Sequence, residues 1–380
     1  MSRMFIDIHI LQTIPPSNVN RDDTGAPKTS IYGGVRRARV SSQAWKKATR
    51  ESFKEYLDAT ELGERTFYAV DRIAKSIIES RPDLADKAVS LAEEIFKVAK
   101  IKISPEKKKN NDETASPKSV TSYLLFLSRI QISNLAQLAI QAHDTGESFN
   151  RKTINKIIQS DNSIDIALFG RMITDSPDLN VDAACQVSHA FSVHPAEIEF
   201  DYFTASDDNK ENDTSGAGMI GTVEFVAPTH YRYATINTEG LISNLDSVEA
   251  AARATEAFLR SFILSMPTGK MNTFANRTRP ELVLVQIRQD QPVNLAESFE
   301  KAITTTTGRM AKATIELASS AKNADETYGS AAKESFYLAT NNADTPETRA
   351  ELDAIGTHVT FDDLISLVGK AVRSRAENNA

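Results

Sequence analysis

The sequence predicts an α+β protein in which one sheet carries two insertions, the first helical and the second a long β-hairpin. Two features of the 380 residues support this prediction. Short segments with the two-residue alternation of strands recur from the N-terminal to the C-terminal part of the chain. Between them lie longer segments whose apolar residues return every three or four positions, as they do on one face of a helix.

The N-terminal part is expected to hold a strand, a loop, a turn and a basic extended segment. Apolar and β-branched residues alternate with polar ones in the strand, and glycines mark the turn. These elements are expected at Phe5–Leu11, Pro15–Ser30, Gly33-Gly34 and Val35–Val40. A helix then opens at Ser41-Ser42-Gln43 and reaches about Leu57, because a serine hydroxyl there can accept a hydrogen bond from an unpaired backbone N–H group.

The region from residue 61 to residue 166 is expected to be mostly helical. Four segments with helical apolar spacing lie near Glu64–Ser80, Leu84–Ala99, Ser119–His143 and Arg151–Gln159. The tract Ser104–Lys118 is poor in apolar residues, which predicts a mobile loop. Its lysines are interpreted as solvated, with contact to nucleic acid as the alternative.

The second half of the chain returns to strands. Strands at Phe200–Thr204 and Thr222–Val226 flank a polar tip at Asp207–Gly218, which predicts a long hairpin arm. Further elements are expected as a strand at Tyr231–Asn237, a helix at Ser247–Met266 capped by Asp246, a buried strand at Leu282–Ile287 and a short strand near Phe336. Without the insertions, the order is strand, helix, strand, strand, helix, strand, which is the ferredoxin-like, RRM-like pattern.

Composition argues against several classes of protein. The formal net charge is -7, which argues against bulk, sequence-blind binding of nucleic acid. The apolar stretches are far shorter than the roughly 20 residues of a membrane-spanning helix, and Asp7 interrupts what would be the apolar part of a secretion signal. Cys185 is the only cysteine, so no intrachain disulfide can form. We therefore expect a cytoplasmic protein without a membrane partner.

One stretch departs from this acidic character. From Lys28 to Arg50 the chain has seven Lys or Arg residues and no Asp or Glu. A basic segment in an acidic protein indicates a focused anion site, although a solvated helix face is the alternative. The start of the helix adds unpaired N–H groups, and Lys46 and Arg50 follow on one face. This arrangement is typical of a site that holds successive phosphates without reading bases. Trp45 is expected in the core.

No catalytic residues, metal or cofactor are predicted. The six histidines form no metalloprotease pattern, and neither a nucleophile elbow nor a phosphate-binding glycine loop is present. His189 is expected to be a buried or half-buried structural ring. The paired acids Asp22-Asp23 and Asp207-Asp208 lie in expected loops, which leaves a metal-dependent nuclease as the alternative.

Five segments of the chain carry a family resemblance. They are Asn20–Asp23, Tyr32–Gln43, Asp165–Met172, Phe203–Asp208 and Tyr231–Asn237. In this order they strongly resemble the CasC family of the RAMP superfamily, which forms the backbone of the type I-E CRISPR Cascade complex. The similarity runs from the first strand to beyond residue 270, and it is weak in the helical insertion and in about the last eighty residues.

The resemblance implies a hand-shaped subunit with an RRM-like palm, helical fingers and a hairpin thumb. The palm would comprise residues 1–60, 181–193 and 224–380, the fingers residues 61–180, and the thumb residues 194–223. In this family the palm holds phosphates of the guide RNA. The thumb of one subunit folds over the guide bound to its neighbour and displaces roughly every sixth base.

The resemblance also implies an RNA interface. The matching phosphate-binding positions are Lys28, Ser41, Gln43, Lys46 and Arg50, and Lys47 and Arg21 lie close by in the sequence. The positions at the bases are Met172, Tyr202, Phe203 and Met219, and the neighbouring Arg171 and Thr204 belong to the same predicted interface. Tyr202, Met219 and Arg50 stand where a tryptophan, a leucine and a lysine are familiar, and each keeps the apolar or cationic character.

The implied partners are the guide CRISPR RNA, the target DNA strand paired to it, about six copies of the chain, other Cascade subunits and a recruited helicase-nuclease. Because that helicase-nuclease cuts the DNA, the resemblance implies no enzymatic activity for this chain. Two alternatives stay open. Backbone subunits of type III effectors cut RNA with an acidic residue in a loop broadly similar to Asn20–Asp23, and a generic RRM-like interaction module would bind no RNA.

Overall fold

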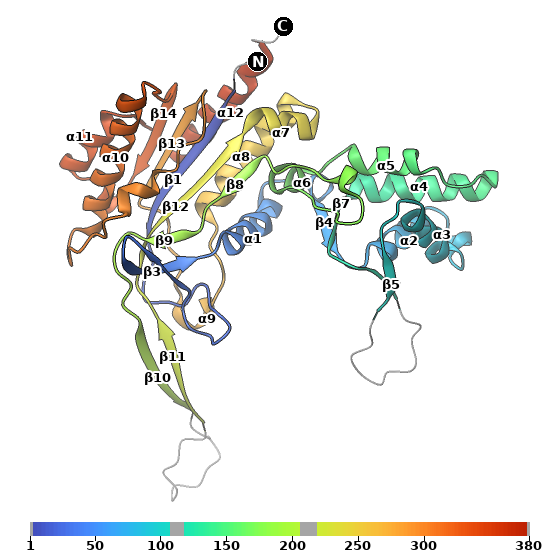
Figure 1. Ribbon diagram of the computed structural model, residues 1–380, viewed down its shortest axis with the longest axis horizontal. Helices are drawn as coiled ribbons and strands as arrows, with labels where there is room; N and C mark the ends of the chain where they lie inside the picture. Colours follow the sequence, from blue (N-terminus) through green and yellow to red (C-terminus); the bar gives the residue numbers. More distant parts are fainter. Residues whose placement is uncertain (1–2, 107–117, 206–218, 378–380) are drawn as a thin grey trace, which may run out of the picture.

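The structure is a computed structural model that describes residues 3–106, 118–205 and 219–377 (Figure 1). Its centre is a nine-stranded sheet in the order β15-β14-β13-β1-β12-β9-β3-β2, with β8 also paired to β12. The strands are β1 (Phe5–Thr13), β2 (Thr29–Tyr32), β3 (Val35–Val40), β8 (Cys185–Val187), β9 (Ala190–Ser192), β12 (Thr229–Asn237), β13 (Leu282–Arg288), β14 (Glu334–Ala339) and β15 (Thr357–His358). The sheet is mixed, because β14 and β15 run parallel whereas β1 is antiparallel to β12 and to β13.

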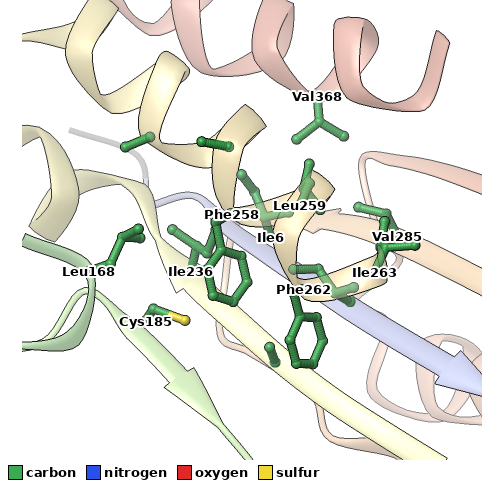
Figure 2. Packing of buried hydrophobic residues seen from close by; sticks show 14 of the residues in the cluster. Ile6, Leu168, Cys185, Ile236, Phe258, Leu259, Phe262, Ile263, Val285 and Val368 are labelled. Atoms are coloured by element: carbon green, nitrogen blue, oxygen red, sulfur yellow. The ribbon is translucent and has the colours of Figure 1, made fainter. Parts of the chain in front are cut away.

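Helices cover both faces of this sheet (Figure 1). The first face packs against α1 (Ser42–Ser52), α8 (Val248–Leu264) and α12 (Phe361–Glu377), and the second against α10 (Arg309–Tyr328) and α11 (Pro346–Asp353). Strand β1 is buried on both sides, since Ile6, Ile8 and Ile10 belong to the first core, while Asp7, His9 and Leu11 are buried on the second side. Figure 2 shows side chains of α8 lying between β1 and α12. The sheet is therefore the middle layer of three.

A helical segment, residues 63–169, leaves the sheet between α1 and β8 and has a hydrophobic core of its own (Figure 1). Its helices are α2 (Ala69–Ser80), α3 (Ala88–Val98), α4 (Arg129–Thr145) and α5 (Arg151–Gln159), and it ends with α6 (Ile164–Phe169), which packs into the first core of the sheet. The segment also contains two small antiparallel sheets of two strands each, β4 (Gly63–Thr66) with β7 (Leu125–Ser128) and β5 (Ile103–Pro105) with β6 (Ser119–Thr121). β4, β6 and β7 were expected as parts of helices, and most of β5 as part of the loop at Ser104–Lys118, because strands this short carry too few residues for a clear two-residue alternation.

The second insertion is the hairpin of β10 (Glu199–Ala205) and β11 (Met219–Phe225), which projects away from the sheet (Figure 1). The two expected strands are thus confirmed. The expected tip at Asp207–Gly218 and most of the expected loop at Ser104–Lys118 lie outside the described residues.

Several smaller elements complete the chain. They are α7 (Thr238–Leu245), α9 (Met271–Phe274) and the 3-10 helices η1 (Phe53–Glu55), η2 (Ala59–Glu61), η3 (Pro82–Leu84), η4 (Pro177–Leu179), η5 (Leu295–Phe299) and η6 (Asn341–Ala343). None of the helices in the described ranges is long and apolar enough to cross a membrane.

The predicted helix starts are right for α1 and wrong for α8. Ser41 caps α1, and its hydroxyl accepts a hydrogen bond from Ala44 N at 3.3 Å. In α8 the cap is Ser247, whose hydroxyl accepts from Ala250 N at 3.2 Å. Asp246 instead ends α7, a helix that the sequence analysis missed, in the left-handed conformation with φ +55°.

Candidate nucleic-acid interface

A groove of about 1270 Å³ lies between α1 and the helical segment. We call it the α1 groove. Its lining cations are Lys46, Lys47, Arg50, Lys54, Arg65, Arg129 and Arg171. Its lining acids are Glu51, Glu64, Asp165 and Asp182. Cations outnumber acids in the lining even though the whole chain is acidic, so the groove is suited to an anionic ligand.

Helix α1 turns its basic side chains to the groove because its opposite side is fixed in the core. Trp45 is fully buried, as predicted, and the Arg232 guanidinium lies 3.7 Å from the centre of its ring. Burial lowers the pKa of Arg232 to about 9, and this guanidinium donates to Gln12 Oε1 at 2.6 Å. With Trp45 held inward, Lys46 and Lys47 follow on the groove side.

The start of α1 is joined to the two-residue link between β8 and β9. Ser42 N donates to His189 Nδ1 at 3.0 Å. Burial, together with the charges of Arg39 and Lys28, lowers the pKa of His189, so the neutral ring that accepts this hydrogen bond is favoured. The residue as a whole is nevertheless exposed to solvent, which makes the prediction of a buried or half-buried histidine wrong.

Arg50 is held by an ion pair that joins α1 to the helical segment. Its Nε lies 2.8 Å from Asp165 Oδ2, and another of its nitrogens donates to Gly63 O at 3.0 Å. The Asp165 side chain is 1% exposed and also accepts from Gly63 N at 2.9 Å and from the Ser163 hydroxyl at 2.7 Å. The guanidinium therefore connects α1, β4 and α6, and this geometry does not support its predicted contact with a phosphate.

We predict that Asp165→Ala destabilises the protein by about 2–4 kcal/mol, because Arg50 and Gly63 N lose a buried partner. Urea unfolding measures this difference. Glu51→Ala is the matched control, since Glu51 pairs with Lys47 across 3.7 Å on the surface and such pairs contribute at most about 1 kcal/mol. An Asp165 variant as stable as the control would contradict the structural role.

Arg171 and Met172 line the groove from its other side but face opposite environments. Arg171 is 4% exposed, and its guanidinium donates to Leu179 O at 3.0 Å and to Ile158 O at 2.9 Å. Burial lowers its pKa to about 10. The side chain holds the helical segment together, so the predicted RNA contact at Arg171 does not fit the structure. Met172 is 78% exposed and free to meet a ligand.

The hairpin carries aromatic side chains on both faces. Tyr202 is 62% exposed and lies opposite Thr222. Phe203 points to the other face, where its ring lies over Gly221, since a Cβ at Gly221 would come within 2.4 Å of the ring. Thr204 is exposed and lies opposite Ile220, and Met219 pairs with Ala205 through the backbone.

The loop between β1 and β2 holds Arg21, Lys28 and the paired acids. Arg21 is exposed and forms a backbone bridge with Pro27, while Lys28 N donates to Asn20 O at 2.9 Å. One carboxylate oxygen of Asp22 accepts from Thr24 N, the Thr24 hydroxyl and Ala26 N, and the hydroxyl is the main cause of its lowered pKa. Asp22 thus shapes a turn.

Several residues of the candidate interface were not expected from the sequence. They include Lys54, Arg65, Leu124 and Arg129 of the α1 groove, and Phe200 and Ile220 of the hairpin. The alternation within Phe200–Thr204 places Phe200 and Tyr202 on one face, so this signal was available. Arg65 and Leu124 come from distant parts of the chain, and only the fold brings them to α1.

The chain resembles one family over almost its whole length. The family model of the CT1975-like proteins matches residues 6–366. The chain belongs to the CT1975-like family of Cas proteins. The residues matched by this model span the sheet, the helical segment and the hairpin.

Two solved structures are similar to this CT1975-like chain. One is described as a "CRISPR RNA-guided surveillance complex, pre-nicking"; it is 34% identical, with 97% of this chain and 100% of that chain covered and a TM-score of 0.83. Another, a "CRISPR RNA-guided surveillance complex", is 31% identical, with 97% and 99% covered and a TM-score of 0.74. A search of the curated proteins finds no match.

Proposed function

We propose that this CT1975-like protein is a CasC-type backbone subunit of a type I-E Cascade complex, which binds guide CRISPR RNA and presents it for pairing with target DNA in antiviral defence. The observation that carries the proposal is the whole-length similarity to chains of RNA-guided surveillance complexes. The α1 groove supplies the chemistry, because exposed cations and the apolar Met172 line one continuous surface.

The order β13-β1-β12-β8, with α1 and α8 on one face, supports an RRM-like palm. In this proposal the helical segment forms the fingers and the hairpin forms the thumb. Copies of the chain, about six per complex, would line up along the guide with other Cascade subunits in the cytoplasm.

The proposed mechanism separates grip from sequence reading. Lys46, Lys47 and Lys28 hold phosphates, which are the same in every guide. The aromatic residues Tyr202 and Phe203 displace roughly every sixth base, and stacking on such side chains returns about 1–3 kcal/mol per base. Sequence reading is then left to base pairing between guide and target.

We further propose that the subunit is not an enzyme and that a recruited helicase-nuclease cuts the target. Asp22, the acid that a type III-like endoribonuclease would need in this loop, is engaged in a turn by three donors. Among the described residues no group of three or more His, Cys, Asp or Glu is arranged to hold a metal ion. The second acidic pair, Asp207-Asp208, lies outside the described residues.

Purification of the tagged chain from cells that express its CRISPR locus tests the proposal. We expect co-purified RNA of one length class with a shared repeat sequence. Acylation of its 2′-hydroxyls should show a period of about six nucleotides, because displaced bases kink the backbone. Absence of RNA would contradict the proposal. Regular cuts in complementary RNA that require a divalent metal and disappear in Asp22→Ala would favour the endoribonuclease.

A further inference from the structure

The loop between β1 and β2 connects the base of the hairpin to the start of α1. At the hairpin end, Ser17 N donates to Val226 O at 2.9 Å and Val226 N donates to Ser17 O at 3.0 Å. At the other end, Ser41 N, at the cap of α1, donates to Asn20 Oδ1 at 2.9 Å. The two candidate binding elements are therefore tied to one short stretch of backbone.

Asn18 closes this connection from inside the protein. Its side chain is fully buried, and its Nδ2 donates to Glu224 O of β11 at 3.0 Å and to Gly25 O at 2.9 Å. One amide group thus holds the base of the hairpin and the far side of the loop at once. A buried amide that keeps both donors engaged resists displacement, because an unpaired buried N–H group costs about 1–3 kcal/mol.

The neighbouring backbone leaves this loop no room to shift. Gly269, in the connection between α8 and α9, lies so close to the loop that a Cβ there would come within 2.1 Å of Val19 O and 3.0 Å of Asn18 O. The loop is therefore also held by this packed backbone. Any change in the angle of the hairpin must break the hydrogen bond from Asn18 to Glu224 O or move this packed backbone.

We propose that Asn18 is a positioning residue that fixes the hairpin relative to α1. It thereby sets the distance between the phosphates held by α1 and the bases displaced by the hairpin. The role in spacing phosphates and bases rests on the proposed function. The fixing of the hairpin by Asn18 does not depend on RNA. Loss of the link leaves the cations of α1 in place and lets the hairpin change its angle.

The mechanical step is tested by the distance between two spin labels on the intact chain. Asp201→Cys in β10 and Glu55→Cys in η1 provide exposed attachment sites, and Cys185→Ala removes the native thiol. We compare Asn18→Asp, which keeps the shape but removes both donors, with Asn244→Asp. Asn244 is the matched control, because its Nδ2 also donates to two carbonyls, Ala167 O at 3.0 Å and Asp182 O at 2.8 Å.

We expect Asn18→Asp to broaden the distance distribution about twofold or more, since two buried hydrogen bonds are lost, and Asn244→Asp to leave it unchanged. Equal widths in the wild type and Asn18→Asp would overturn the inference. Asn18→Ala provides a second variant should the aspartate fail to fold, as judged by its circular dichroism, and the same outcomes apply to it.

The functional step is tested by 2′-hydroxyl acylation of bound guide RNA. In Asn18→Asp we expect the dissociation constant to change by less than about threefold, because phosphate contacts dominate affinity, while the periodic acylation spreads to neighbouring nucleotides. If Asn18→Asp widened the distribution of spin-label distances but left the acylation pattern of the RNA unchanged, Asn18 would not set the spacing between phosphates and displaced bases. If the wild type showed no periodic acylation, both the proposed function and this role of Asn18 would be overturned. The spin-label distances would still decide whether Asn18 fixes the hairpin.

Discussion

Replacing Lys46 and Lys47 by alanine is expected to weaken binding of guide-length RNA roughly tenfold near physiological salt. Each phosphate contact on single-stranded RNA contributes about 0.7 to the slope of log affinity against log salt. Loss of two contacts should therefore lower that slope by about 1.4, and the effect should be similar for every guide sequence. Filter binding or isothermal titration calorimetry across a salt series measures both the affinity and this slope.

The structure explains why these two lysines are the residues to change. Lys47 is 76% exposed, and its ion pair with Glu51 spans 3.7 Å, a surface pair that a phosphate readily replaces. Lys46 lines the groove beside Phe169, whose ring centre lies 5.7 Å from the lysine nitrogen. Arg50 is unsuitable for this experiment, because its removal would leave Asp165 buried without its cation.

A matched control is available outside the groove. Lys75 of α2 and Lys97 of α3 are each 65% exposed and pair with an acid one turn away at 3.8 Å, much as Lys47 does. The Lys75→Ala, Lys97→Ala double variant makes the same change in net charge. If it weakened RNA binding as much as the groove variant does, affinity would come from overall charge and the assignment of α1 would fail.

Acidification from pH 7 to pH 5.5 is expected to lower the free energy of unfolding by about 3 kcal/mol. Three histidines are the cause, namely His9, His194 and His230, which are 0%, 7% and 2% exposed. Burial lowers the pKa of His9 and of His230 to about 3 and that of His194 to about 4. The unfolded chain takes up protons below about pH 6.5, while the folded protein keeps these rings neutral.

The sign follows from that order of protonation. Because the unfolded state binds protons first, stability is present above pH 6.5 and is lost as the pH falls, by about 1.2 kcal/mol per ring over this interval. Asp7 acts in the opposite sense. Burial raises its pKa to about 6, so the folded protein protonates it before the unfolded chain does, which adds back about 1 kcal/mol.

Urea unfolding at the two pH values measures this loss. His194→Gln should reduce it by about one third, because Thr229 N and Arg309 donate toward His194 Nε2 at 3.1 and 3.2 Å and oppose its protonation. His358→Gln is the control, since His358 is exposed in the folded protein. Equal stability of the wild type at both pH values would contradict the prediction that the three buried rings stay neutral in the folded protein.

Local patterns in the sequence were sufficient for five strands of the sheet, β1, β3, β12, β13 and β14, and for the orientation of α1, whereas the shorter β2, β8, β9 and β15 were missed. Two-residue alternation in Phe5–Leu11 and Tyr231–Asn237 identified two central strands, because successive side chains of a strand point to opposite faces of the sheet. The turn at Gly33-Gly34 was also predicted, and both residues have positive φ, at +58° and +78°. The bulky Trp45 among cations was enough to tell which side of α1 is buried.

Which charged residues pair with one another could not be predicted from the sequence. Arg50, Lys46 and Lys47 look equivalent in a basic helix, but Asp165 lies far along the chain and only the fold brings it to Arg50. Arg171 adjoins the exposed Met172, yet its side chain turns inward to carbonyl groups of the helical segment. A residue type predicts charge, whereas solvent exposure depends on contacts between distant segments.

The contact between Trp45 and Arg232 has a practical consequence. Trp45 is the only tryptophan in the 380 residues, so all indole emission from this chain arises at the interface between α1 and β12. Detachment of α1 would expose the indole to water and shift its emission to longer wavelength. RNA bound on the opposite side of α1 would leave the indole shielded. Ligand binding and undocking of the helix are thus optically separable in the native, unlabelled protein.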